Sequence, residues 1–198
     1  MASKRSTPMQ MALSVIIVCA LAAGSLAATY GVTKDRILAQ EKAAEERALN
    51  AVLADAESFE PIDEAALESA REIAGDVPVS AAWRALDSSG EISGWGIRIG
   101  PRGYSGPIQM IVGLDREGSV TGVMIITIND TPGLGTRVRD EPGHLEQYQG
   151  LDANQMESEI KNVDAITGAT KSSRGVRHGV EAAAAVYAEV LAVAGAAQ

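Results

Sequence analysis

The sequence predicts an α+β fold in which helices flank an antiparallel sheet, preceded by one N-terminal transmembrane helix. Three observations lead to this prediction. No charged residue lies between Arg5 and Lys34, residues 81–129 contain short apolar segments separated by turn residues, and an alanine-rich helical pattern fills the C-terminal part of the chain. With 198 residues, the chain can form one domain with a sizeable core and an appendage.

The composition excludes several classes of protein. A net charge of −9 and a sequence pI near 4.7, with no cluster of Lys and Arg in the long C-terminal part, argue against nucleic-acid binding. Cys19 is the only cysteine and lies within the apolar run, so no intramolecular disulfide can form. His144 and His178 are far apart and lack the spacing of metal ligands. We therefore expect no metal site.

The apolar run predicts a transmembrane helix over residues 9–30, because about 20 apolar residues span a bilayer. Lys4 and Arg5 precede it, which places residues 1–8 in the cytoplasm and the rest of the chain outside it. A cleaved signal peptide is the alternative, since residues 25–27 are small enough for a signal peptidase. We favour the anchor because the run is longer than a typical signal core. Val18 before Cys19 disfavours a lipoprotein.

Residues 31–76 are predicted to form an acidic helical stalk or linker. Residues 34–56 have helical composition without Gly or Pro, Pro61 interrupts the pattern, and residues 62–74 form a second helix that Gly75 ends. Residues 35–76 carry twelve acidic and four basic side chains, which is typical of a solvated helix surface. The globular domain is then expected over residues 77–198.

Four strands are predicted in this domain. Residues 81–87 and 92–99 form a hairpin, residues 107–114 alternate with apolar residues on one face, and residues 119–129 form the last strand. This last strand is apolar on both faces, so both sides of the sheet should be covered. Residues 138–162 are polar and predict no regular element.

Two loops are candidates for function. The first contains Thr131, Gly133, Leu134 and Gly135, and its two glycines and one proline shape a loop at the end of a buried strand. The second runs over residues 164–170 and precedes a helix predicted over residues 173–194, whose apolar stripe belongs in the core.

The basic residues Lys171, Arg174 and Arg177 gather where this helix starts, and a helix dipole disfavours cations there. Their clustering is explained if an anion, such as a phosphate, binds at this end of the helix. In the competing interpretation, the loop only supplies Ser172 or Ser173 as a helix cap.

With these loops described, the chain resembles the FMN-binding domain family, which includes the G subunit of Rnf-type electron-transport complexes and the C subunit of sodium-pumping NADH:quinone reductase. The Asp164-Ala165-Ile166-Thr167-Gly168-Ala169-Thr170 segment is similar to the family's flavinylation pattern, and the loop from Thr131 to Gly135 resembles a second loop of the family. Many relatives have Glu where this chain has Asp130, which puts a direct role of Asp130 in doubt.

The resemblance implies that FMN is attached covalently to Thr170 through a phosphoester bond. It also implies that Asp164, Thr167, Gly168 and Ala169 form the sequence that a flavin transferase reads, and that residues 77–198 are an extracytoplasmic FMN-binding domain. We expect Lys171 to lie near the phosphate and Thr131, Gly133, Leu134 and Gly135 to lie near the flavin ring. No catalytic side chain is expected, because the flavin supplies the chemistry.

The favoured function is an electron-carrying subunit of an Rnf-type complex in the inner membrane, with one membrane pass, the domain on the periplasmic side, and other subunits as partners. The C subunit of the sodium-pumping reductase is the alternative within the family. Outside it, the chain could be a membrane-anchored binding or scaffold module without flavin. A stand-alone flavin reductase lacks a nicotinamide-binding fingerprint, since Gly133-Leu134-Gly135 opens no helix.

Overall fold

The computed structural model describes residues 8–192, and the chain divides into two compact units between Ala44 and Glu45. Helix α1 runs over Pro8–Val52 and is 45 residues long; its residues up to Ala44 belong to the first unit and the rest to the second. This helix contains a window long and apolar enough to cross a membrane, none of it buried within the protein. The expected apolar helix and its extension are thus one continuous helix, which ends at Val52 rather than near residue 56. The predicted cytoplasmic segment lies, except for Pro8, outside the described residues.

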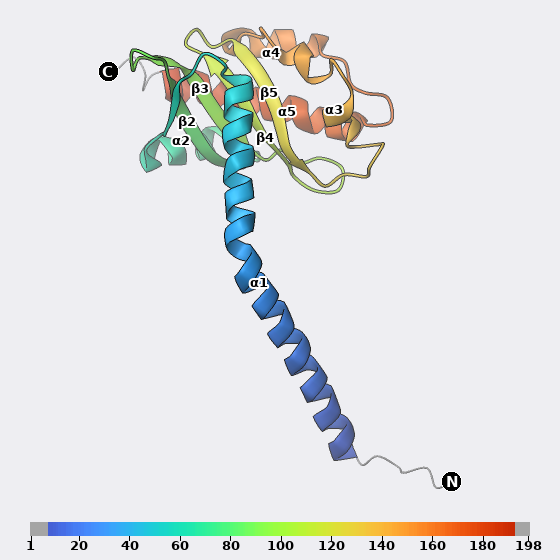
Figure 1. Ribbon diagram of the computed structural model, residues 1–198. Helices are drawn as coiled ribbons and strands as arrows, with labels where there is room; N and C mark the ends of the chain where they lie inside the picture. Colours follow the sequence, from blue (N-terminus) through green and yellow to red (C-terminus); the bar gives the residue numbers. More distant parts are fainter. Residues whose placement is uncertain (1–7, 193–198) are drawn as a thin grey trace. The chain divides into compact units, whose positions relative to one another are not determined.

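The second unit contains a five-stranded sheet in which every neighbouring pair is antiparallel and the spatial order follows the sequence (Figure 1). The strands are β1 (Ser58–Pro61), β2 (Val79–Leu86), β3 (Ile92–Ile99), β4 (Ile108–Asp115) and β5 (Val120–Ile128). The four predicted strands and the antiparallel sheet are therefore confirmed.

Helices α2 (Glu64–Ala74) and α5 (Thr170–Val186) pack on one face of the sheet and form the main hydrophobic core with it. Asp63 caps α2 by accepting a hydrogen bond from the Ala66 N–H at 2.8 Å, and Gly75 ends it at a positive φ of 62°. A π-helical turn, η4 (Tyr187–Leu191), continues α5. The predicted apolar stripe is buried, as expected: Val176, Val180, Ala183, Tyr187 and Leu191.

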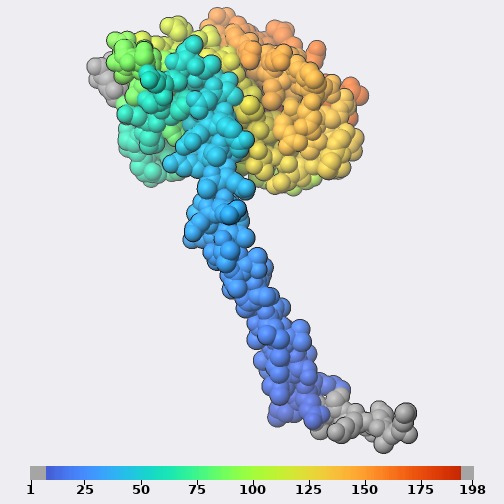
Figure 2. All heavy atoms as spheres, viewed as in Figure 1, coloured from blue at the N-terminus to red at the C-terminus, as the bar shows by residue number. Residues whose placement is uncertain are grey.

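The last turns of α1 cover the opposite face of the sheet, where a second apolar cluster forms (Figure 2). Three glycines lie side by side across this face, because Gly96 of β3 pairs with Gly113 of β4, and Gly113 pairs with Gly122 of β5. With no side chains in this row, Leu49 and Val52 of α1 approach the strand backbones closely. The Thr121 hydroxyl donates to the Val52 carbonyl at 2.5 Å. Both faces of the sheet are thus covered, as the apolar residues on both sides of the last predicted strand indicated.

Two predictions from the sequence need correction: one strand was not predicted, and the compact domain begins earlier than expected. Strand β1 was not predicted, because a four-residue edge strand has no visible alternation and Pro61, its last residue, reads as a helix breaker. Since β1 pairs with β2 and α2 packs in the core, the compact domain begins at Glu45 rather than at residue 77.

The part of the chain around residues 138–162, for which the sequence predicts no regular element, forms short helices. They are α3 (Arg137–Asp140), η1 (Leu145–Tyr148), η2 (Ala153–Gln155), α4 (Met156–Glu159) and η3 (Ile160–Asn162). None exceeds four residues, so none could produce a helical period in the sequence.

Candidate functional site

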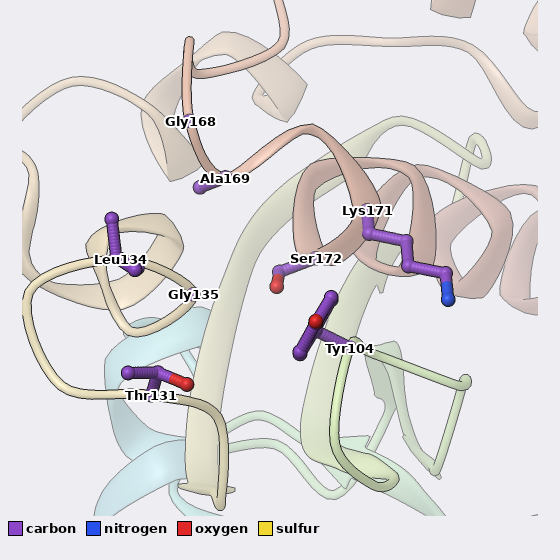
Figure 3. Close-up of a pocket in the computed structure, with 8 residues that line it drawn as sticks. All are labelled: Tyr104, Thr131, Leu134, Gly135, Gly168, Ala169, Lys171 and Ser172. Atoms are coloured by element: carbon purple, nitrogen blue, oxygen red, sulfur yellow. The ribbon is translucent and has the colours of Figure 1, made fainter.

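Three segments that are far apart in the sequence surround a cavity of about 230 Å³ (Figure 3). One follows β3, one follows β5, and the third is the turn and first residues of α5. The lining residues are Tyr104, Thr131, Leu134, Gly135, Gly168, Ala169, Lys171 and Ser172. The two loops singled out in the sequence therefore meet in space, although the 28 residues 136–163 separate them.

The turn before α5 depends on Gly168, which has a φ of 85° that other residues rarely adopt. The Ala169 N–H then donates to the Ile166 carbonyl at 2.9 Å, and α5 begins at Thr170. The helix thus starts three residues before the predicted start, and its predicted end at residue 194 lies outside the described residues. Thr170 itself is exposed in the first turn.

Neither serine caps the helix, so the capping interpretation is wrong. Ala169 occupies the cap position and makes no side-chain cap hydrogen bond. Ser172 and Ser173 lie inside the helix and are buried. Ser173 accepts a hydrogen bond from the Ile166 N–H at 3.1 Å, and Ser172 donates to Asp130 at 2.5 Å. Both hydroxyls therefore hold loops against the helix instead of satisfying its first N–H groups.

Side chains outside the motif hold its backbone. The Arg137 guanidinium donates to the Thr167 carbonyl at 2.6 Å, and Arg177 donates to the Val163 carbonyl. The Gln147 side-chain oxygen accepts from the Asp164 N–H at 2.9 Å. The sequence did not point to Arg137 or Gln147, because single polar residues outside a repeating pattern or motif carry no signal.

The predicted site residues separate into groups. Thr131, Leu134, Gly135, Gly168, Ala169 and Lys171 line the cavity. Asp164 and Thr170 instead line a neighbouring hollow of about 200 Å³, together with Tyr148, Ala165, Ser173, Arg174 and Arg177. Gly133 and Thr167 line neither. Gly133 shapes the loop at a φ of 75°, with its N–H donating to the Thr136 hydroxyl at 3.0 Å.

The chemistry of the two hollows differs. The cavity has large exposed apolar groups at its rim, since Tyr104 is 64% and Leu134 54% exposed. The Lys171 ammonium lies 5.3 Å from the centre of the Tyr104 ring. Two guanidinium groups, of Arg174 and Arg177, line the hollow beside Thr170. This arrangement suits a ligand with one planar aromatic end and one anionic end.

Asp130 is a buried carboxylate between the loops, with only 4% of its surface exposed. Burial raises the pKa of Asp130, but hydrogen bonds from the Ser105 N–H, the Ser172 hydroxyl and the Tyr104 N–H outweigh it and hold the pKa below its ordinary value of 3.8. These contacts are with other segments of the domain, and the expectation about a direct role of Asp130 at the flavin stays a prediction.

Tyr148, beneath the motif, yields a pH prediction. Burial raises its pKa to about 12, against an opposing effect of Arg177 and with a further increase from Glu181. The unfolded chain ionises this phenol near pH 10, so the folded domain should lose stability between pH 10 and about 12. Chemical denaturation over this range measures the loss. Tyr148→Phe should reduce it, leaving the part due to Tyr187, whose pKa burial also raises; an equal loss in the variant would contradict the prediction.

Comparison with known proteins shows which family the chain resembles. The model of the FMN-binding domain family matches residues 103–185, and the model of the RnfG N-terminal region matches residues 10–52. The chain is 30% identical over 192 residues to the G subunit of the Na(+)-translocating ferredoxin:NAD(+) oxidoreductase complex of Acetobacterium woodii, with 90% of each chain covered. It is 31% identical to the G subunit of the ion-translocating oxidoreductase complex of Aliivibrio fischeri, with 91% of each covered.

Among solved structures, NqrC of Shewanella oneidensis has a similar fold. Its TM-score is 0.50 at 23% identity, with 60% of this chain and 62% of that chain covered. The likeness extends to the α+β architecture that the sequence predicted.

Proposed function

The chain belongs to the family of G subunits of ion-translocating oxidoreductase complexes, and from this we propose that it carries electrons within such a complex through FMN attached covalently to Thr170. The other subunits of the complex would be its partners. The single observation that carries the proposal is the meeting of both family loops at one cavity, directly beside Thr170.

The residues present fit FMN. Arg174 and Arg177 line the same hollow as Thr170 and would hold the phosphate charge. Tyr104 and Leu134, at the cavity rim, offer apolar surface to the flavin ring, and Lys171 adds a cation beside it. When bound, FMN supplies one- and two-electron transfer. The chain's own residues have to bind it, orient it and exclude water from its ring.

We propose that attachment is a phosphoryl transfer from FAD. The Thr170 hydroxyl attacks the phosphorus on the flavin side of the pyrophosphate, the bond to the AMP phosphate breaks, and AMP leaves as the hydroxyl loses its proton. A flavin transferase would read the motif for this step. The exposure of Asp164, Thr167 and Thr170 supports this reading, since a second protein can reach all three.

We propose that α1 anchors the chain in the membrane, because it contains an apolar stretch long enough to span a bilayer. The basic residues Lys4 and Arg5 on its N-terminal side favour a cytoplasmic N-terminus. The flavin domain would then lie on the periplasmic side. A signal peptide cleaved near Ala27 would instead release it.

The test is to produce the full chain in membranes with and without its flavin transferase. We expect a fluorescent band on a denaturing gel only with the transferase, and an intact mass increased by FMN minus one water. The same mass reports any cleavage near Ala27. A chain that stays flavin-free beside an active transferase would overturn the covalent proposal.

A further inference from the structure

Asp130 stands out among the buried polar groups because it lies outside the flavinylation motif and yet contacts the segments that form the cavity. It lies two residues after Ile128, the end of β5, and precedes the Thr131 loop. A buried carboxylate is costly unless several donors satisfy it. The positions of those donors therefore indicate what the side chain holds together.

Three hydrogen bonds reach this carboxylate from two other segments. Ser172 of α5 donates its hydroxyl to Oδ2 at 2.5 Å. The backbone N–H of Ser105 donates to Oδ1 at 2.7 Å, and that of Tyr104 donates to Oδ2 at 3.2 Å. Hydrogen bonds to a charged acceptor are stronger than neutral ones. One side chain thus connects the start of α5, the Tyr104 loop and the end of β5.

Three glycines allow the segments around Asp130 to approach one another closely. A Cβ added to Gly103 would lie 2.9 Å from Oδ2 of Asp130, and one added to Gly135 would lie 2.8 Å from it. A Cβ on Gly175 of α5 would lie 2.6 Å from the Arg102 carbonyl oxygen. Any side chain at these positions would push the segments apart. The three segments are therefore packed at backbone distance around the carboxylate.

We propose that Asp130 is the positioning residue of the flavin site: its ionised carboxylate fixes Ser172 and the Tyr104 loop relative to the Thr131 loop, and so sets the width of the cavity. The positioning role rests on the proposed function only for the identity of the ligand, FMN, that the cavity would bind. Ser172 lines the cavity and donates to the carboxylate, so the charge is one hydrogen bond away from a residue of the lining. The fixed negative charge would therefore also lower the potential of a flavin bound there, since reduction adds negative charge.

The test uses the full chain in detergent with Asp130→Asn, and Asp140→Asn as the control, because Asp140 is an exposed carboxylate paired with Arg139 outside the cavity. On flavin-free protein, amide hydrogen exchange at Tyr104 and Ser105 should accelerate about tenfold in Asp130→Asn, since a bond to a charged group is lost. It should not change in Asp140→Asn. Equal exchange in wild type and Asp130→Asn would overturn the proposal.

On flavin-loaded protein, the midpoint potential should rise in Asp130→Asn and stay at the wild-type value in Asp140→Asn. An unchanged potential in Asp130→Asn would overturn the electrostatic part of the proposal. If no flavin is attached to the wild type, the proposed function fails, while the exchange measurement still decides the positioning role.

Ser172→Ala serves as the second variant if Asp130→Asn does not fold. It keeps the carboxylate but removes its link to α5, so exchange at Tyr104 and Ser105 should accelerate by less than in Asp130→Asn. The potential should change little, because the charge remains. Exchange at the wild-type rate in Ser172→Ala would show that the carboxylate does not couple α5 to the loop.

Discussion

Thr170→Val should yield a folded chain that carries no covalent flavin. Valine has nearly the volume of threonine but lacks the hydroxyl that would attack the FAD phosphorus. Thr170 is exposed, and its hydroxyl makes no hydrogen bond to the part of the chain that the structure describes. The free energy of unfolding should therefore change by less than about 0.5 kcal/mol. Intact mass and denaturing-gel fluorescence measure the flavin, and chemical denaturation of flavin-free protein measures the stability.

Two variants control for this result. Thr167→Val removes the other exposed hydroxyl of the motif. Because the transferase would read Thr167, this variant should carry less flavin, and any flavin that it retains cannot be on Thr167. Thr170→Ser restores a hydroxyl at the attachment position and should recover part of the flavin. A fluorescent Thr170→Val band would place the attachment elsewhere on the chain.

The sheet could be predicted because its long strands carry visible signals. The turns at Gly90 and Gly118, both with positive φ, separate apolar runs of eight or nine residues. The start of α5 could not be predicted, because capping statistics favour Ser172 or Ser173 and the contacts that draw both serines into the helix come from distant segments. Local preference was overridden by tertiary hydrogen bonds.

The sequence pointed to residues that line the cavity where the family pattern is continuous, and it did not point to those that lie outside such a pattern. Tyr104 lies in a stretch rich in Gly and Pro, residues 100–107, which could have been read as a third shaped loop. Arg137 and Gln147 act through motif carbonyl and N–H groups, and no sequence spacing predicts such contacts. The sequence does not show the role of Asp130, because that role depends on hydrogen bonds from Ser172 and from the Tyr104 loop, which are distant in sequence.

Gly113→Ala should destabilise the domain by about 2 kcal/mol, through overpacking against α1. The added Cβ would lie 2.6 Å from the Thr121 hydroxyl oxygen and 2.8 Å from the Val52 carbonyl oxygen. These two atoms share the hydrogen bond that fastens the end of α1 to the sheet. The carbonyl belongs to the backbone, so relief requires α1 to move away and expose the apolar cluster beneath it. Chemical denaturation of the full chain in detergent measures the effect.

The same glycine row supplies the control. A Cβ on Gly122 would meet Val52 atoms at 3.4 Å or more, which is ordinary contact, so Gly122→Ala should be neutral or slightly stabilising. A Cβ on Gly96 would lie 2.5 Å from a Leu49 methyl group, which can rotate away, so Gly96→Ala should fall between the two. Equal stability of the Gly113 and Gly122 variants would mean that α1 is not seated closely on the row. Because the row lies on the face opposite α5, flavin attachment at Thr170 should persist in all three variants that fold.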